Sequence, residues 1–265
     1  MIRLVICDMD GTIIGKDEQL PQELPALISE LKERGILFSI ATGRSEAFME
    51  PLIRRMGVDV PYVASNGATI MQNGQARLRK QFPIHEVRHI LEMAQEMGMS
   101  LVFTSGGADR VIKITPWLMK EADKHGTAYA AEPFAEAEWE SYRAEKVLIM
   151  DEVRDGRISI IEDMCKASLG GSFCYVRYRD KAVELMEKSA NKAEGIREIL
   201  AMLQIPVSEV LVIGDDDNDI QMFQLGAVSA AVGNASKNVL PYVNYHCKGN
   251  EFAGVQEAIL KYCGV

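Results

Sequence analysis

The chain has 265 residues, 48% of them hydrophobic and 25% charged, with a net charge of −9. This length suffices for one large domain or for a core domain that carries a smaller one. The acidic composition contains neither a Lys/Arg-rich tract nor an apolar run of membrane-spanning length, so we expect no nucleic-acid partner and no membrane span. The short apolar N-terminal run is a poor signal peptide, and the five cysteines are widely spaced, so we expect a cytoplasmic protein with reduced thiols.

Strands and amphipathic helices alternate in the first 64 residues. Apolar residues recur at helical spacing in two segments, each followed by a glycine that suits a helix C-terminus. Pro51 lies inside the second of these helices and lowers the expectation that it is unbroken. The predicted strands are 2–7, 36–41 and 62–64, and the predicted helices are 22–34 and the segment from Ser45 to Gly57.

The same alternation returns after residue 190. Asn191 with Glu194 resembles a capping box that opens a helix through Leu203. Strands are predicted at 210–213 and 228–232, and a helix at 252–262. This pattern predicts an α/β fold, with a Rossmann-like, mostly parallel sheet covered by helices on both faces.

The middle of the chain has a pattern of its own. Its predicted helices are 87–94 and 158–167, and its predicted strands are 101–104, 111–114, 146–150 and 173–178. We therefore expect an inserted α+β domain of residues 83–188, and a core domain made of residues 1–82 and 189–265.

Two acidic residues follow the first predicted strand directly, in the run Asp8-Met9-Asp10-Gly11-Thr12. Loops beyond the carboxyl ends of parallel strands are where ligands bind in such sheets. Carboxylates two residues apart can project to the same side, where their repulsion requires a cation, a shared proton or separate roles. The run is also compatible with an ordinary strand-terminal turn, since Asp and Gly favour turns.

A denser acidic run, Gly214-Asp215-Asp216-Asp217-Asn218-Asp219, follows the predicted strand at 210–213. Carboxylates at this density favour a hard cation such as Mg²⁺, which often takes one or two of them and completes its shell with water and substrate phosphate. A solvated acidic turn is the alternative. An EF-hand is a poor one, because Gly and Glu are missing from the loop positions that require them.

A candidate phosphate site lies at Thr42-Gly43-Arg44, after the second predicted strand. A hydroxyl group, backbone N–H groups and a helix N-terminus just beyond them suit an anion, although Thr and Gly also commonly cap helices. Lys192 begins the predicted helix after Asn191. A lone lysine is usually solvated, so it becomes relevant only if the fold brings it to the same sheet edge.

The order of these motifs resembles the haloacid dehalogenase superfamily. The matching residues are Asp8-x-Asp10-x-Thr12, Thr42-Gly43-Arg44, Lys192 and Gly214-Asp215-x-x-Asn218-Asp219. Two further segments are similar to its Cof-like sugar-phosphatase branch with a type IIB cap: Ser65-Asn66-Gly67-Ala68 and Ala231-Val232-Gly233-Asn234-Ala235. The chain departs from many members at Asp216, where they carry Gly. The resemblance implies that the inserted domain is a substrate-selecting cap.

The resemblance also implies the catalytic roles. Asp8 would attack phosphorus and form an aspartyl phosphate, and Asp10 would protonate the leaving oxygen and then activate water. Lys192 would neutralise charge on Asp8 and the phosphoryl group. The implied phosphate-binding groups are Thr42, the backbone N–H groups of Met9 and Gly43, Lys192 and Asn218. The implied cofactor is Mg²⁺, with Asp8, the Asp10 backbone carbonyl and Asp215 as its ligands and with Asp219 orienting Lys192 or metal-bound water.

The reaction expected from this resemblance is hydrolysis of a small phosphorylated metabolite, such as a hexose phosphate or a flavin or pyridoxal phosphate. A phosphosugar mutase of the same superfamily is one alternative. A non-catalytic phosphosugar-binding sensor is another, although the complete set of acidic and basic motif residues argues against it. Basic side chains of the inserted domain could contact the substrate or remain solvated: Lys113, Lys146, Arg177 and Arg179.

Overall fold

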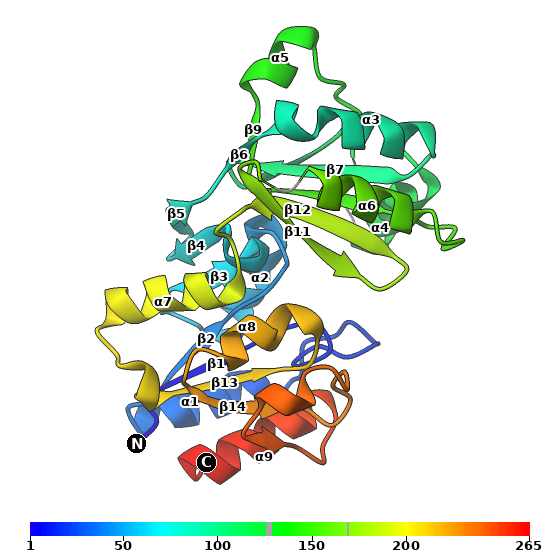
Figure 1. Cartoon of the computed structure of the whole chain (residues 1–265). Coiled ribbons are helices and arrows are strands. Elements are labelled where there is room, and N and C mark those ends of the chain that lie inside the picture. Colours follow the sequence, from blue (N-terminus) through cyan, green and yellow to red (C-terminus); the bar gives the residue numbers. More distant parts are fainter. Residues whose placement is uncertain (126–128, 169) are drawn as a thin grey trace. The chain divides into compact units, whose positions relative to one another are not determined.

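The computed structural model describes residues 1–125, 129–168 and 170–265. These residues form two compact units: a core unit made of Met1–Leu78 with Asn191–Val265, and an inserted unit made of Arg79–Ala190 (Figure 1). Each unit has its own sheet and its own hydrophobic core. Within the described ranges, every helix is too short or too polar to cross a membrane.

A parallel five-stranded sheet forms the centre of the core unit, in the order β15-β14-β13-β1-β2. All four residues of β1 (Leu4–Cys7), which lies between β13 and β2, are fully buried, as expected for a parallel strand that is covered on both faces. The other strands are β2 (Leu37–Ile40), β13 (Val210–Gly214), β14 (Val228–Ala231) and β15 (Tyr245–His246).

One face of this sheet packs against three helices. Val5 and Cys7 of β1 belong to a hydrophobic cluster that also contains side chains of these helices. The helices are α1 (Leu24–Glu33), α2 (Glu46–Met56) and α9 (Glu251–Cys263). Their apolar residues recur three and four positions apart, so each helix presents one apolar side to the sheet.

The opposite face packs against two helices. Leu4 and Ile6 of β1 belong to a second cluster, together with side chains of α7 (Lys192–Leu203) and α8 (Ile220–Phe223). Side chains that alternate along β1 therefore reach both layers of helices. This arrangement confirms the predicted Rossmann-like α/β class, with helices on both faces of a parallel sheet.

The helix ends follow local sequence. Helix α2 runs through Pro51 without a break, so the doubt raised by that proline is not borne out. It ends at Gly57, which has a left-handed φ of 75°. Asn191 caps α7, because its Oδ1 accepts a hydrogen bond from the backbone N–H of Glu194 at 2.9 Å.

A small antiparallel sheet follows α2. It contains β3 (Tyr62–Ala64), β4 (Thr69–Gln72) and β5 (Gln75–Arg79). A parallel bridge between Ala41 and Val63 places β3 beside the carboxyl end of β2. The loop that follows β3 is thereby directed to the same edge of the core sheet.

The inserted unit is built on a five-stranded antiparallel sheet, in the order β11-β12-β10-β7-β8. Its hydrophobic cluster includes side chains of α3 (Arg88–Glu96) and α6 (Ile158–Ala167). The strands are β7 (Ser100–Ser105), β8 (Ala108–Val111), β10 (Lys146–Met150), β11 (Phe173–Tyr178) and β12 (Ala182–Glu187). The remaining elements are β6 (Phe82–Pro83), β9 (Arg143–Ala144), α4 (Pro116–His125) and α5 (Glu136–Ser141).

Several elements of the inserted unit differ from the sequence prediction, which gave no helix at α4 or α5 and no strand at β6, β9 or β12. The strand expected at 111–114 lies earlier, at Ala108–Val111, because it pairs across a tight turn with β7. Strand β12 is an apolar run that contains Glu184. Glu184 is nevertheless 2% exposed, and its carboxylate accepts hydrogen bonds from Lys146 at 2.8 Å and from Tyr178 at 3.0 Å. These partners compensate its burial.

Candidate active site

The candidate site lies at the carboxyl edge of the core sheet. Asp8 directly follows β1, and Asp215 directly follows the neighbouring strand β13. Thr42 lies two residues after β2, the strand on the other side of β1. Because the strands are parallel, these residues are brought to one edge, which is where ligands bind in open α/β sheets.

Lys192 connects two of the acidic side chains. Its Nζ donates hydrogen bonds to Asp8 Oδ1 and to Asp219 Oδ1, each at 2.6 Å. The lysine is only 1% exposed and begins α7, whose start is fixed by the Asn191 cap. Burial alone would lower the pKa of Lys192, but the carboxylates of Asp219 and Asp8 outweigh it and raise that pKa. Lys192 is therefore a fixed positive charge beside Asp8.

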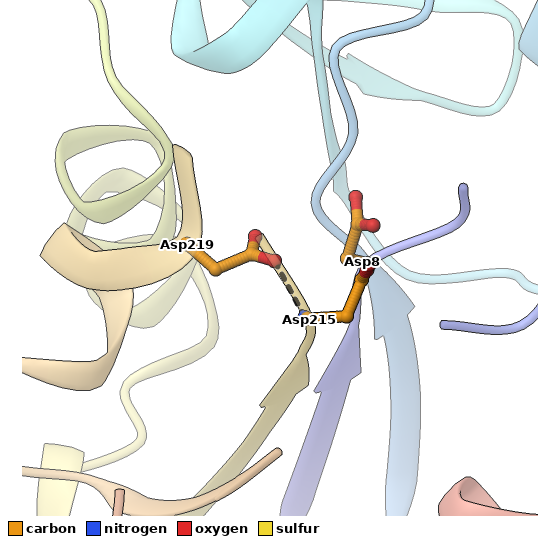
Figure 2. Close-up of side chains that lie close together, drawn as sticks. All are labelled: Asp8, Asp215 and Asp219. Atoms are coloured by element: carbon orange, nitrogen blue, oxygen red, sulfur yellow. Dashed lines mark hydrogen bonds between the residues drawn. The ribbon is translucent and has the colours of Figure 1, made fainter. Parts of the chain in front are cut away.

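Asp219 is held by hydrogen bonds to both of its carboxylate oxygens. Oδ1 accepts from Lys192, and Oδ2 accepts from the backbone N–H groups of Asp215 at 2.9 Å and Asp216 at 3.1 Å. Figure 2 shows the Asp219 side chain reaching back from its turn toward the end of β13. Of the two roles expected for Asp219, this geometry fits the orientation of Lys192.

Asp215 is fixed by Thr12 and pressed close to Gly11. Thr12 Oγ1 donates a hydrogen bond to Asp215 Oδ1 at 2.7 Å. A Cβ atom at Gly11 would lie 2.4 Å from Asp215 Oδ2, and its φ of 85° also favours glycine. Burial raises the pKa of Asp215 to about 7, and the charge of Asp219 adds to this effect. Gly11 and Thr12, in the loop after β1, therefore fit closely against Asp215, which follows β13.

Burial also raises the pKa of Asp8 well above its usual range. The charge of Lys192 opposes this rise, whereas the carboxylates of Asp219, Asp215 and Asp10 add to it. The charge of Lys192 therefore offsets only part of the effect of burial on the pKa of Asp8. The acidic side chains at this edge outnumber the basic ones: Asp8, Asp10, Asp215 and Asp219 against Lys192 and Arg44.

Three carboxylates are close enough to share a metal ion. One oxygen each from Asp8, Asp215 and Asp219 lies within 4.8 Å of the others (Figure 2). Since both oxygens of Asp219 already accept hydrogen bonds, Asp8 and Asp215 are the members best able to bind a cation. Their oxygen ligands, their burial and the excess negative charge together suit a hard divalent ion. The carboxylate of Asp10 is not part of this group.

Asp10 is bound by Arg44 instead. Arg44 Nε donates to Asp10 Oδ2 at 2.9 Å, and Arg44 Nη2 donates to Asp10 Oδ1 at 2.6 Å. The Asp10 side chain is 57% exposed, whereas that of Arg44 is 23% exposed. Asp10 therefore stands at the solvent side of the site, and Asp8 at its buried side.

The expected phosphate-binding residues lie around the same edge. Thr42 and Met9 are fully buried, and Thr42 Oγ1 accepts a hydrogen bond from the Arg44 backbone N–H at 3.1 Å. Asn218 Nδ2 donates to Asn66 Oδ1 at 3.2 Å. The Asn66 backbone N–H in turn donates to the Thr42 carbonyl oxygen at 2.9 Å. Asn66 thus connects the loop after β13 to the loop after β2.

Sequence reasoning left three contacting residues without a role: Thr12, Arg44 and Asn66. Each one lies within a motif that the sequence displayed, so the signal was present. Their partners are distant in sequence, with Thr12 separated from Asp215 by 203 positions and Asn66 from Asn218 by 152. Motif spacing cannot reveal such contacts, because they depend on strand order in the sheet.

Comparisons with known proteins identify the family of this chain. The profile of the haloacid dehalogenase-like hydrolases matches residues 5–259. The chain is 24% identical over 269 residues to the 5-amino-6-(5-phospho-D-ribitylamino)uracil phosphatase YbjI of Escherichia coli, covering 98% of this chain and 96% of that one. It is 25% identical over 240 residues to a phosphoglycolate phosphatase of Methanopyrus kandleri, covering 90% and 88%.

A solved structure shares the whole fold. The subclass IIB sugar phosphatase BT4131 of the same superfamily superposes with a TM-score of 0.82 at 19% identity, covering 99% of this chain and 100% of that one. This likeness confirms the predicted architecture of a parallel-sheet core with an inserted α+β cap. Because the family profile spans nearly the entire sequence, the chain belongs to the haloacid dehalogenase-like hydrolases, as the order of its motifs predicted.

Proposed function

We propose that this protein is a Mg²⁺-dependent phosphatase that hydrolyses small phosphorylated metabolites through an aspartyl phosphate on Asp8. The observation that carries the proposal is the contact of Asp8 with Lys192, at the carboxyl end of β1. A carboxylate is a weak nucleophile toward an anionic phosphoryl group unless positive charge is fixed nearby. Lys192 supplies such charge, and its contact with Asp219 holds it in place.

In the first half of the reaction, Asp8 attacks phosphorus. Lys192 engages Oδ1, so we assign the attack to Oδ2. The new bond from Oδ2 to phosphorus forms while the bond from phosphorus to the leaving oxygen breaks. Asp10, protonated at this stage, gives its proton to that oxygen, and the free alcohol leaves. The exposed position of Asp10 suits contact with a group that must depart.

In the second half, water attacks the phosphorus of the aspartyl phosphate. Asp10, now ionised, takes a proton from this water as the new bond to phosphorus forms. The bond between phosphorus and Asp8 breaks, which returns the Asp8 carboxylate and releases inorganic phosphate. Asp10 is protonated again, so the site is ready for another cycle.

The transferred group would be held by Thr42, Asn218, Lys192 and the backbone N–H groups of Met9 and Gly43. Thr42 is buried two residues after β2, and β2 pairs with β1, the strand that precedes Asp8. The Asn66 contacts join Asn218 to Thr42 and support a common orientation. Fixed donors of this kind stabilise charge without reorganising during the reaction.

Mg²⁺ fits the same site. The carboxylates of Asp8 and Asp215 and the backbone carbonyl of Asp10 would hold it, and bound Mg²⁺ would supply positive charge against the phosphoryl oxygens. The raised pKa values of Asp8 and Asp215 arise from burial among like charges, and a divalent ion would favour their ionised forms.

The inserted unit would select the leaving group. The two curated relatives are named for small organic phosphates, which supports a substrate of that size here. Of the basic candidates, Arg177 contacts Glu162 and Ser159 of α6, and Lys146 contacts Glu184 within the sheet. We therefore assign neither of them to the substrate, which leaves Lys113 and Arg179 as candidates.

The test is phosphate release from p-nitrophenyl phosphate and a panel of sugar phosphates, with Mg²⁺ and with EDTA. We expect release that requires Mg²⁺, that is abolished in Asp8→Asn and that is retained in Asp59→Asn, which changes an exposed carboxylate of the core unit. Release that is insensitive to EDTA or to Asp8→Asn would contradict the proposal. Transfer of label between sugar phosphates without net release would replace it with a mutase.

A further inference from the structure

We propose that Arg44 is a positioning residue that aims the carboxylate of Asp10 at the leaving-group oxygen. This inference rests on the proposed function, because it assigns a role in the same reaction. It concerns a residue that acts through Asp10 and does not itself hold the transferred phosphoryl group.

The first argument is the geometry of the pair. Arg44 donates through Nε and Nη2 to the two different oxygens of Asp10, at 2.9 and 2.6 Å. A planar guanidinium that binds both oxygens of a carboxylate fixes the plane of that carboxylate as well as its position. A lysine would hold the charge of Asp10 without fixing its orientation. When Asp10 is protonated for the first step, one oxygen carries the proton that goes to the leaving group and the other oxygen still accepts from Arg44.

The second argument is that Arg44 is itself anchored. Its backbone N–H donates to Thr42 Oγ1 at 3.1 Å, and its carbonyl oxygen accepts from the Ser65 N–H at 2.8 Å. Burial alone would lower the pKa of Arg44, but hydrogen bonding to Asp10 and the charge of Asp10 raise it. Arg44 therefore stays charged in the loop after β2.

The third argument is that Asp10 needs such support. Its side chain is 57% exposed, and an exposed carboxylate on a turn can adopt several rotamers. A proton donor is effective only within hydrogen-bond reach of the atom that receives the proton. Anchored in the loop after the neighbouring strand β2, Arg44 restrains the Asp10 carboxylate, which solvent alone would leave free to rotate.

A positioning role for Arg44 predicts a kinetic effect that a purely structural role does not. Phenyl phosphate and p-nitrophenyl phosphate have almost the same shape, but phenolate is the more basic leaving group and depends more on protonation. Misaiming Asp10 should therefore lower kcat/KM more for phenyl phosphate than for p-nitrophenyl phosphate. Loss of a residue that only supports the fold should lower both values by the same factor.

The experiment compares Arg44→Gln and Arg44→Lys with Asp10→Asn and with Arg3→Gln, which removes an exposed ion pair just before the amino end of β1. For both Arg44 variants we expect a loss in kcat/KM on the order of a hundredfold for phenyl phosphate, and a loss about tenfold smaller for p-nitrophenyl phosphate. The inhibition constant of inorganic phosphate should stay unchanged, and Arg3→Gln should match the parent protein. Asp10→Asn should show the same leaving-group pattern, and adding Arg44→Gln to it should cause little further loss.

Equal losses for the two substrates, together with weaker inhibition by inorganic phosphate, would overturn the inference and make Arg44 a phosphate ligand. If Arg44→Gln does not fold, Arg44→Lys keeps the positive charge, and the same ratio decides. If Asp10→Asn shows no leaving-group dependence, the acid role of Asp10 in the proposed function fails. If Asp10→Asn shows it and neither Arg44 variant does, only the role of Arg44 fails.

Discussion

Both units bury a lysine beside carboxylates, but they place these groups at different points of a sheet. Lys146 lies within β10 of the inserted unit, and its Nζ donates to Glu184 on the adjacent strand β12 at 2.8 Å. Lys192 of the core unit reaches Asp8 and Asp219 beyond the ends of parallel strands, each at 2.6 Å. One lysine spans two strands, and the other joins two loops.

The lysine of the inserted unit therefore stabilises its sheet, whereas the lysine of the core unit belongs to the candidate site. Glu184 has partners within its own sheet, as a buried charge requires. At the core edge, Asp215 adds a further carboxylate beside Asp8 and Asp219, and together they are the one group of three potential metal ligands within the described ranges. Similar side chains therefore support a strand in one unit and create an excess of negative charge in the other. That excess can be neutralised by a cation.

Replacing each lysine in turn is the strongest test of the difference between the two units. We expect Lys192→Met to lower kcat for p-nitrophenyl phosphate on the order of a thousandfold, because the fixed charge beside Asp8 is lost. Lys146→Met should leave kcat per folded molecule unchanged and lower the free energy of unfolding by about 3 to 5 kcal/mol, since it leaves Glu184 buried without its cation. Urea unfolding and activity per folded molecule measure the two effects. Large activity loss in Lys146→Met with normal stability would reverse the assignment.

Gly67 and Gly57 provide a matched test of the close contact between Gly67 and Asn191. A Cβ at Gly67 would lie 2.1 Å from the carbonyl oxygen of Asn191, whereas a Cβ at Gly57 would meet nothing within 4 Å. Both residues have a positive φ, so the backbone strain is similar. We expect Gly67→Ala to cost about 3 kcal/mol or more of unfolding free energy and Gly57→Ala about 1 kcal/mol. Equal costs in urea titrations would show that the contact with Asn191 is unimportant.

Metal addition should test directly whether the carboxylates at the core edge bind a cation. Mg²⁺ at a hundred times its dissociation constant should stabilise the parent protein by about 2.7 kcal/mol, because only the folded site gathers the ligands. Asp215→Asn should lose most of this gain, and Asp59→Asn should keep it. Thermal unfolding with Mg²⁺ and with EDTA provides the measurement. Stabilisation that survives Asp215→Asn would place the ion elsewhere.

The smallest expected effect is the pH dependence of the metal-free protein. Burial raises the pKa of Asp215 from 3.8 to about 7, so between these values the folded chain keeps a proton that the unfolded chain has released. Stability from this group therefore falls as pH rises, by at most about 1.4 kcal/mol per pH unit. In EDTA, the parent protein should lose more stability than Asp215→Asn when pH rises from 5 to 7. The opposite order would mean that Asp215 is already ionised.

Most of the fold could be predicted because its signals are local. Strand β3, β10 and helix α6 lie at the residues that periodicity indicated, and the Asn191 cap forms as the sequence suggested. Strand β12 could not be found this way. Its buried Glu184 is tolerated through partners that only the folded sheet supplies.

The candidate site was likewise predictable where its signals are local and unpredictable where contacts depend on the fold. The positions of Asp8, Asp215 and Lys192 beyond strands or at a helix start could be predicted, since motifs after parallel strands converge at one sheet edge. The pairing of Asp10 with Arg44 could not, because a sequence does not show which of several nearby partners a side chain takes. The same holds for Asn66 and Asn218, which lie far apart in the chain.

The central claim is that Asp8 becomes phosphorylated. The direct measurement is rapid acid quenching of the Asp10→Asn variant with p-nitrophenyl phosphate and Mg²⁺, followed by borohydride reduction and tandem mass spectrometry of the tryptic peptide of residues 4–16. Reduction converts an aspartyl phosphate to homoserine, and Asp10→Asn should slow its hydrolysis enough for it to accumulate. We predict homoserine at position 8. Phosphate release without any modification at position 8 would contradict the account.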